Sequence, residues 1–89
     1  MKTVTLDASH DTMEAIYNTL QRELGLPAHF GRNLDALWDV LTGDVAGPLE
    51  IVWRDHAWAR GKLGPDYDRL ITTLRDVENE REDFLLTLA

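Results

Sequence analysis

Three short β-prone runs separated by long segments with a helical repeat restrict the fold of this sequence more than any other feature. The runs cover residues 3–6, 49–53 and 84–88. Strands that are joined by long helical connections pair most naturally in parallel, through right-handed crossovers. The middle run is apolar except at Glu50, so we expect it to be the central strand, buried on most of its surface. The sequence therefore predicts an α/β fold in which a three-stranded parallel sheet packs against about four helices.

The first helical segment has its own start and stop signals. Asp11, followed three residues later by Glu14, matches a capping box at the head of an apolar repeat. Gly25 and Pro27 end that repeat. These signals predict a helix over residues 12–24.

The second helical segment carries a regular apolar stripe. Asn33 can cap its start, and Gly43 stands at its end. The stripe follows the i, i+3, i+4, i+7 spacing of one helix face. Its members are Leu34, Leu37, Trp38 and Leu41. We expect a helix over residues 34–42, with Trp38 in the core.

Two further helices are expected before the last strand. Asp55 can cap a short one that reaches about Arg60, before the break at Gly64-Pro65. A longer one follows, with apolar residues at helical spacing. These residues are Tyr67, Leu70, Ile71, Leu74 and Val77. Trp53 is expected in the core. Trp58 has no clear assignment and could lie in the core or at a contact with a partner.

The domain organisation and compartment follow from what the sequence lacks. It has no repeat, linker or low-complexity segment, so we expect one domain over residues 1–89. Its first residues lack the apolar core of a signal peptide, and no apolar run is long enough to cross a membrane. We therefore expect a cytoplasmic protein.

Charge and cysteine usage narrow the classes of function. Sixteen acidic residues against nine basic ones give a formal charge of −7. Such a chain repels nucleic acid and anionic membranes, so a macromolecular partner is expected to be basic. The absence of cysteine excludes a disulfide framework, a thiolate zinc site and a cysteine nucleophile, and it suits a reducing compartment.

Two aspartates on the second helix break a local rule. Asp35 and Asp39 lie one turn apart, off the apolar stripe, and such a like-charge pair destabilises a helix by roughly 0.2–0.5 kcal/mol. Asp39 is also near the negative end of the helix dipole, and Asp44 follows just beyond it. A helix shaped by stability alone would carry Lys or Arg there. The ordinary explanation is a solvated polar face with an accidental charge pattern.

A second acidic cluster follows near the end of the chain, relieved only by Arg75 and Arg81. If the second and last helices are neighbours, the two clusters form one negative face. The members of this second cluster are Asp76, Glu78, Glu80, Glu82 and Asp83.

Catalysis and metal binding are both disfavoured by the pattern. Paired carboxylates can act as acid and base, but these lie on an exposed helix with no evident pocket, nucleophile or cofactor motif. His10, His29 and His56 are scattered, without the spacing of a zinc site and without cysteine to complete one. We expect no enzyme activity, no cofactor and no metal.

The segment HFGRNLDALWDVLTG, residues 29–43, resembles the signature of the barstar family, and PLEIVWR, residues 48–54, resembles the strand that follows it there. The resemblance covers essentially the whole chain. Its specificity comes mostly from the run 33–43. The positions that match the family signature in register are Gly31, Asn33, Leu34, Asp35, Leu37, Trp38, Asp39 and Gly43.

This resemblance implies a binding protein. Barstar-like proteins inhibit secreted guanyl-preferring ribonucleases and protect the producing cell, and they fill the nuclease active site with the second helix and its preceding loop. By resemblance, Asp39 is the principal contact and Asp35 lies beside it, while Asp76 and Glu80 steer and border the interface. The implied contact surface comprises His29, Phe30, Gly31, Asn33, Leu34, Asp35, Trp38, Asp39, Thr42, Gly43, Asp44, Asp76 and Glu80.

The implied partner is a basic microbial ribonuclease in a 1:1 complex, and the free inhibitor is expected to be a monomer. The physics agrees, because a nuclease must offer cations to RNA phosphates and a rigid pair of carboxylates can replace those anions. Neither nucleic acid nor a membrane is expected as a partner.

Several positions depart from the family pattern. The founding member has aromatic residues where this chain has His29 and Asp44, and an acidic residue where it has Arg32. Asp76 is shorter than the glutamate found there. Two lost aromatic contacts remove binding area, so we expect a related ribonuclease and not barnase itself as the partner.

Two other interpretations remain open at this point. The same face could serve an immunity or regulatory protein directed at a basic partner that is not a ribonuclease, such as a DNase toxin. Alternatively, the domain could be structural or self-associating, with Trp58 or Phe30 at a dimer surface.

Overall fold

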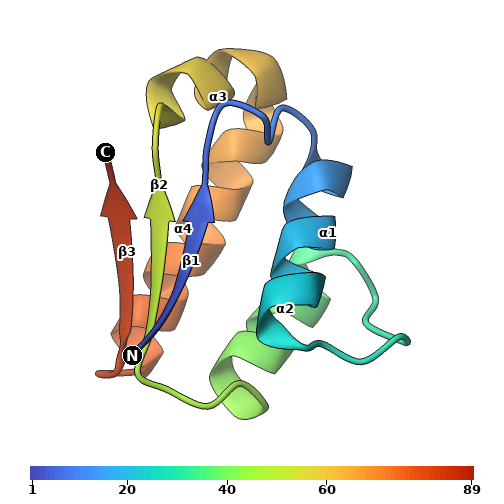
Figure 1. Ribbon diagram of the computed structural model, residues 1–89, viewed down its shortest axis with the longest axis vertical. Coiled ribbons are helices and arrows are strands. Elements are labelled where there is room, and N and C mark those ends of the chain that lie inside the picture. Colours follow the sequence, from blue (N-terminus) through green and yellow to red (C-terminus); the bar gives the residue numbers. More distant parts are fainter.

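A computed structural model describes residues 1–89, and it contains the three strands and four helices that the sequence predicts (Figure 1). The sheet is parallel throughout, with the order β1-β2-β3, so the middle run is the central strand as expected. The elements are β1 (Lys2–Leu6), α1 (Met13–Leu24), α2 (Leu34–Gly43), β2 (Leu49–Trp53), α3 (His56–Leu63), α4 (Pro65–Glu80) and β3 (Phe84–Leu88).

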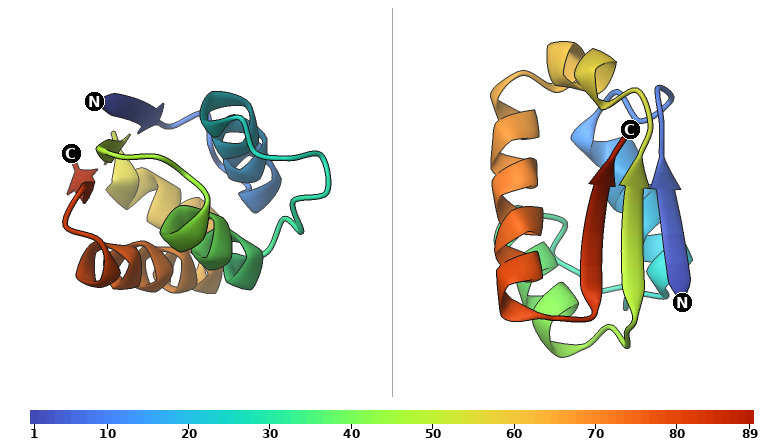
Figure 2. Two further views of the ribbon diagram at one scale, coloured as in Figure 1. Left: turned by 90° about the horizontal axis from the view of Figure 1, so that it is seen from below. Right: turned by 90° about the vertical axis from the view of Figure 1, so that its left-hand side faces the viewer.

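The helices all cover one face of the sheet (Figure 2). In β1, Val4 and Leu6 are buried while Thr3 and Thr5 are exposed, which is the alternation of a strand with one covered face. Val4 pairs with Ile51, and Ile51 pairs with Leu86. None of the helices has the length and hydropathy that a membrane crossing requires.

The outer edge of β3 is closed by side chains of α4. The Leu86 N–H donates to Glu78 Oε2 at 2.7 Å, and the Leu86 carbonyl accepts from Arg75 Nη1 at 3.2 Å. Arg75 and Glu78 also pair with each other at 2.7 Å. The two side chains occupy groups that an edge strand would otherwise offer to another chain.

The start of α1 lies one residue later than the capping box predicts. Thr12 is the N-cap, and its side-chain oxygen accepts from the Ala15 N–H at 3.1 Å. Glu14 therefore occupies the second helical position, one short of the place that a capping box centred on Asp11 needs. The end at Gly25 is as predicted, since this glycine adopts φ 64°, which glycine tolerates without strain.

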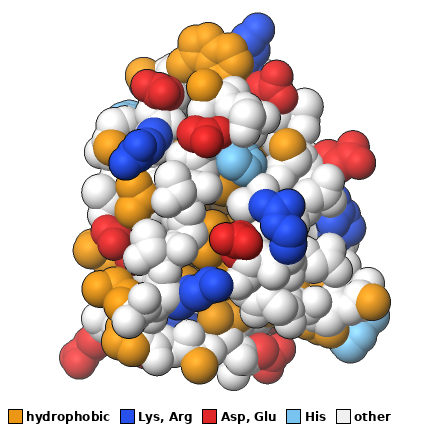
Figure 3. Space-filling view, viewed as in Figure 1, with side chains coloured by type: hydrophobic (Ala, Val, Ile, Leu, Met, Phe, Trp, Pro, Cys, Tyr) orange, Lys and Arg blue, Asp and Glu red, His pale blue; other side chains and the backbone are white.

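The third helix is longer than the sequence suggests. It continues through Gly61 to Leu63, because Ala59 and Leu63 lie one turn apart and both are buried. Asp55 is the N-cap residue as predicted, with φ 55°, but its side chain makes no cap hydrogen bond. Trp58, in this helix, is 46% exposed. Figure 3 shows hydrophobic side chains gathered at the top of the molecule, where α3 lies.

The core lies between the sheet and the helices and is a single cluster of 21 buried side chains. Trp53 is fully buried as expected, with its ring 5.4 Å from that of Tyr67. Its Nε1 has no hydrogen-bond partner. Trp38 is only partly buried and packs against the outside of the cluster.

Candidate functional site

The start of α2 is fixed by its cap and its apolar face. Asn33 Oδ1 accepts from the Ala36 N–H at 2.8 Å, which confirms the predicted N-cap. Leu37 and Leu41 are fully buried and hold the helix against the core. The remaining face of α2, including both aspartates, is turned toward solvent. Local sequence therefore suffices to place these carboxylates on a rigid exposed face.

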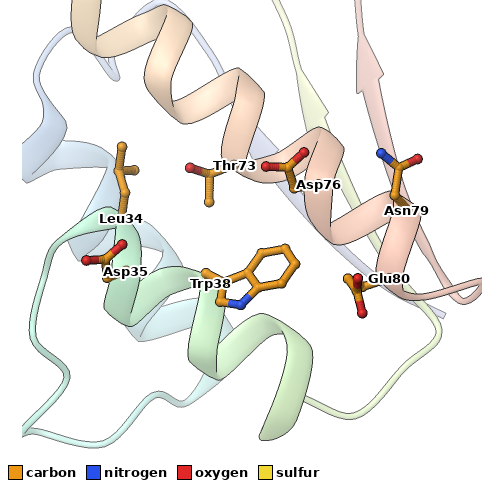
Figure 4. Close-up of a pocket in the computed structure, with 7 residues that line it drawn as sticks. All are labelled: Leu34, Asp35, Trp38, Thr73, Asp76, Asn79 and Glu80. Atoms are coloured by element: carbon orange, nitrogen blue, oxygen red, sulfur yellow. The ribbon is translucent and has the colours of Figure 1, made fainter.

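An acidic hollow of about 470 Å³ lies between α2 and α4. The Trp38 indole occupies its middle, and carboxylates from both helices surround the ring (Figure 4). The residues that line this acidic hollow are Leu34, Asp35, Trp38, Thr73, Asp76, Asn79 and Glu80. The second and last helices are thus neighbours, which is the condition under which the two acidic clusters meet, and two separate stretches of sequence contribute to one surface.

Five carboxylates on or beside α2 and α4 have no internal partners, and we call the surface that they form the α2–α4 face. The ion pairs in the structure engage Asp7, Glu23, Asp66, Glu78 and Asp83. No hydrogen bond or ion pair involves the side chains of Asp35, Asp39, Asp44, Asp76 or Glu80, and all five are exposed. On the face seen in Figure 3, by contrast, acidic and basic side chains are intermixed. The α2–α4 face therefore presents uncompensated negative charge.

Only part of the C-terminal acidic cluster joins this face. Glu78 turns to β3, and Asp83 pairs with Arg81. The lining of the hollow contains neither residue, whereas Asp76 and Glu80 both belong to it. No group of three or more His, Asp or Glu side chains is arranged to hold a metal ion.

The loop before α2 combines an exposed histidine with a buried aromatic ring. His29 is exposed, whereas Phe30 is only 6% exposed and packs edge-on against Tyr17, with ring centroids 5.9 Å apart. The Phe30 N–H donates to the Pro27 carbonyl at 2.9 Å. The Phe30 ring thus ties the loop to α1, and Gly31 is exposed beside it.

Arg32 turns away from the acidic hollow. It adopts φ 53°, and its guanidinium donates to Gln21 Oε1 at 3.0 Å and to Asn18 Oδ1 at 2.7 Å. Its guanidinium carbon is 5.9 Å from the centroid of the Tyr17 ring. These bonds hold the positive charge on α1, and sequence spacing alone could not have placed it there.

The C-terminal end of α2 receives its cation from a distant part of the chain. Arg81 Nη1 donates to the Leu41 carbonyl at 2.7 Å and to the Val45 carbonyl at 2.8 Å. The expected Lys or Arg of the last turn is therefore supplied by tertiary structure. The Thr42 hydroxyl donates to the Trp38 carbonyl one turn earlier, at 2.7 Å, and so does not serve the last carbonyls. Sequence reasoning assigned Arg81 to the acidic cluster and missed this role.

A family model described as Barstar (barnase inhibitor) matches residues 1–89. The chain belongs to the barstar family. It is also similar to the Bacillus subtilis (strain 168) protein named "Putative ribonuclease inhibitor YrdF". The two are 32% identical over 84 residues, which cover 93% of this chain and 92% of the relative.

The barstar-family positions that depart from the common pattern are now placed in space. His29 and Asp44 are both exposed, on either side of α2 along the chain. Gly43 ends the helix, and Asp44 follows it as the C-cap with φ −113°. These two departures thus place an imidazole in the loop before α2 and a carboxylate at its C-terminal end, both open to solvent.

One pH effect follows from the Arg81 pair in this barstar-family fold. Hydrogen bonds from Arg81 hold the pKa of the Asp83 carboxyl below its ordinary value. A lowered folded-state pKa adds stability above the unfolded value of about 4, and this contribution is lost as pH falls through the folded value. We therefore expect Asp83→Asn to lower the free energy of unfolding at pH 7, with the gap to the wild type closing below about pH 4.

Denaturant unfolding of both proteins between pH 7 and pH 2 checks this expectation. Asp7, whose pKa is also lowered, chiefly by the Ser9 hydroxyl, is unchanged in the variant and cancels in the difference. A gap that stays constant through acid pH would show that the Asp83 carboxylate adds nothing to stability.

Proposed function

We propose that this protein inhibits a small, basic, guanyl-preferring ribonuclease by covering its cationic active site with α2 and the loop before it. Membership of the barstar family and the likeness to a protein named as a ribonuclease inhibitor support this role. The observation that carries the proposal is the set of exposed, unpaired carboxylates on two packed helices, at a net charge of −7. Such a surface complements a site built to hold RNA phosphates.

Rigidity makes these carboxylates effective anions. α2 is fixed by its Asn33 cap, by buried Leu37 and Leu41 and by Arg81 at its end. A ligand that is already ordered loses little conformational entropy on binding. The like-charge pair of Asp35 and Asp39, unfavourable in the free helix, is relieved when cations of the partner lie beside it.

The individual roles follow the position of each residue. Asp39 is the principal contact with the nuclease cations, and Asp35 supports it at the mouth of the acidic hollow. Exposed His29, Gly31 and Asn33 contribute the loop side. Buried Phe30 acts by holding the loop in place. Leu34 and Trp38 supply apolar contact, and Asp76 and Glu80 attract the partner. The contact surface is completed at the C-terminal end of α2 by Thr42, Gly43 and Asp44.

The proposal includes a 1:1 complex, a monomeric free inhibitor and a cytoplasmic location in the cell that produces the nuclease. It assigns no catalytic residue, no cofactor and no bound nucleic acid. An alternative is an immunity protein directed at another basic toxin. The exchange of two aromatic contacts for His29 and Asp44 changes the fine specificity of the surface, which suits a ribonuclease related to barnase.

The experiment that tests the function is inhibition of a panel of small microbial guanyl-preferring ribonucleases by the purified protein. RNA cleavage and direct binding are followed at two salt concentrations. We expect tight 1:1 inhibition of at least one enzyme, with association slower at the higher salt because exposed charges are screened. Failure to bind any ribonuclease, together with binding to a basic DNase toxin, would move the assignment to the alternative.

A further inference from the structure

Arg81 connects two helices that carry the proposed binding surface. Its backbone N–H caps α4 by donating to the Val77 carbonyl at 2.9 Å. Its side chain reaches the end of α2, where it donates to the carbonyls of Leu41 and Val45 at 2.7 and 2.8 Å. Arg81 thus satisfies carbonyl groups at the ends of both helices. In sequence it lies 40 positions from Leu41 and 36 positions from Val45.

The rest of the guanidinium is held by Asp83. Arg81 Nε and Nη2 donate to the two oxygens of that carboxylate at 2.8 and 2.9 Å. The side chain of Arg81 is only 12% exposed and its bonds to the two carbonyls are partly buried, whereas Asp83 is 48% exposed. Bidentate bonds of this kind are directional as well as strong, and they fix the plane of the guanidinium. We call Arg81, Asp83 and the carbonyls of Leu41 in α2 and Val45 just after it the Arg81 clamp.

The segment after α2 is shaped to accept the Arg81 clamp. A Cβ atom at Gly47 would overlap the Asp83 carboxylate and the Arg81 guanidinium, so only glycine leaves room for the pair. The Asp83 carbonyl also accepts from the Leu49 N–H at 2.8 Å, at the start of β2. The loop between α2 and β2 is therefore built around this ion pair.

We infer that Arg81 is a positioning residue for ribonuclease binding. By joining the end of α2 to the end of α4, it fixes the spacing between Asp39 and Asp44 on one side and Asp76 and Glu80 on the other. The inference rests on the proposed function, because it treats those carboxylates as the binding surface. Arg81 itself acts through the helices and need not touch the partner.

The physical reason is that α2 has an electrostatic weakness at its end. Asp39 and Asp44 lie near carbonyls that already carry partial negative charge, and the helix contains no basic residue in its last turn. Without a cation, the final turn would loosen and the carboxylates would be less ordered before binding. Ordering them during binding would then reduce affinity, chiefly through faster dissociation.

The experiment compares Arg81→Met with Arg75→Met. Each change removes one positive charge and one ion pair, at the C-cap of α4 for Arg81 and within α4 for Arg75, so both alter the net charge equally. Arg75 faces β3 and is absent from the acidic hollow, which makes it the matched control. Binding to a ribonuclease that the wild type inhibits is measured at a temperature where unfolding curves show both variants folded.

We expect Arg81→Met to raise the Kd roughly tenfold relative to Arg75→Met, through a faster off-rate. Arg81→Lys should restore part of this loss, because an ammonium can reach the carbonyls but cannot bond Asp83 in a fork. Gly47→Ala, which crowds the Arg81 clamp without altering charge, should also weaken binding. Equal Kd values for Arg81→Met and Arg75→Met would overturn the inference.

A second readout needs no partner. The N–H groups of Asp44 and Val45 both donate to the Val40 carbonyl in the last turn of α2, so their hydrogen exchange reports its order. We expect faster exchange of these two amides in Arg81→Met than in Arg75→Met. Unchanged exchange would refute the positioning role. Faster exchange in a protein that inhibits no ribonuclease would support the positioning of α2 and count against the proposed function alone.

Discussion

Asp39→Ala is expected to abolish tight inhibition of the ribonuclease partner while leaving the fold intact. Asp39 is exposed on α2 and has no partner within the protein, so its removal disturbs no internal contact. In the complex, its loss leaves a cation of the nuclease buried without an anion, and breaking a desolvated charge pair costs about 3–5 kcal/mol. This corresponds to an increase in Kd of roughly 100- to 4000-fold.

The matched control for this prediction is Asp11→Ala. Asp11 is also exposed and unpaired, but it precedes α1 and lies outside the α2–α4 face. Both variants lose the same charge, so any shared slowing of association measures steering alone. We expect the excess loss in Asp39→Ala to appear in the off-rate, measured by surface-bound kinetics at two salt concentrations. Similar Kd values for the two variants would exclude Asp39 as the principal contact.

Trp53→Ala is expected to remove a large share of the free energy of unfolding. Trp53 is fully buried at the end of the central strand and packs against Tyr67. Replacing such a residue by alanine leaves a cavity and costs about 3–5 kcal/mol. Domains of this size are stable by only about 5–15 kcal/mol, so the loss is a large share of the total. Denaturant unfolding followed by circular dichroism measures it.

Trp58→Ala is the control, because it removes the same side chain from an exposed site. Trp58 is 46% exposed and lies under the Lys62 ammonium, which is 5.3 Å from the ring centroid. We expect its loss to change stability by about 0.5 kcal/mol or less. Comparable losses at the two positions would contradict the burial of Trp53.

Trp53→Phe separates the two properties of that indole. The ring fills the core, but its Nε1 has no hydrogen-bond partner, and a buried unpaired donor destabilises a protein by about 1–3 kcal/mol. Phenylalanine keeps most of the apolar volume and removes the donor. We therefore expect Trp53→Phe to lose much less stability than Trp53→Ala.

The architecture and the exposed position of the α2 aspartates were readable from the sequence, because they depend on short-range periodicity. The apolar stripe of α2 predicted its buried face, and the buried face left Asp35 and Asp39 outside. The β-prone runs were separated by helical segments too long for hairpins, which required a parallel sheet. The observed start of α1 and end of α3 differ from the predicted ones by only a few residues. At such boundaries, packing of single side chains can outweigh the local capping and helix-breaking signals.

What only the tertiary structure decided is how distant groups meet. The placement of Asp76 and Glu80 beside Asp35 depends on the packing of α4 against α2, which no local pattern encodes. The burial of Phe30 against Tyr17 likewise depends on where the loop crosses α1.

The sequence by itself determined which elements form and that α2 exposes two unpaired aspartates, because side chains at fixed helical spacing share a face. The sequence places no basic residue in the last turn of α2, so no neighbouring side chain along the chain can balance the negative end of the helix. The fold supplies Arg81 from the end of α4, since α2 and α4 pack together and end beside each other. Electrostatic compensation depends on distance in space and not along the chain, and for that reason it could be recognised only in the folded protein.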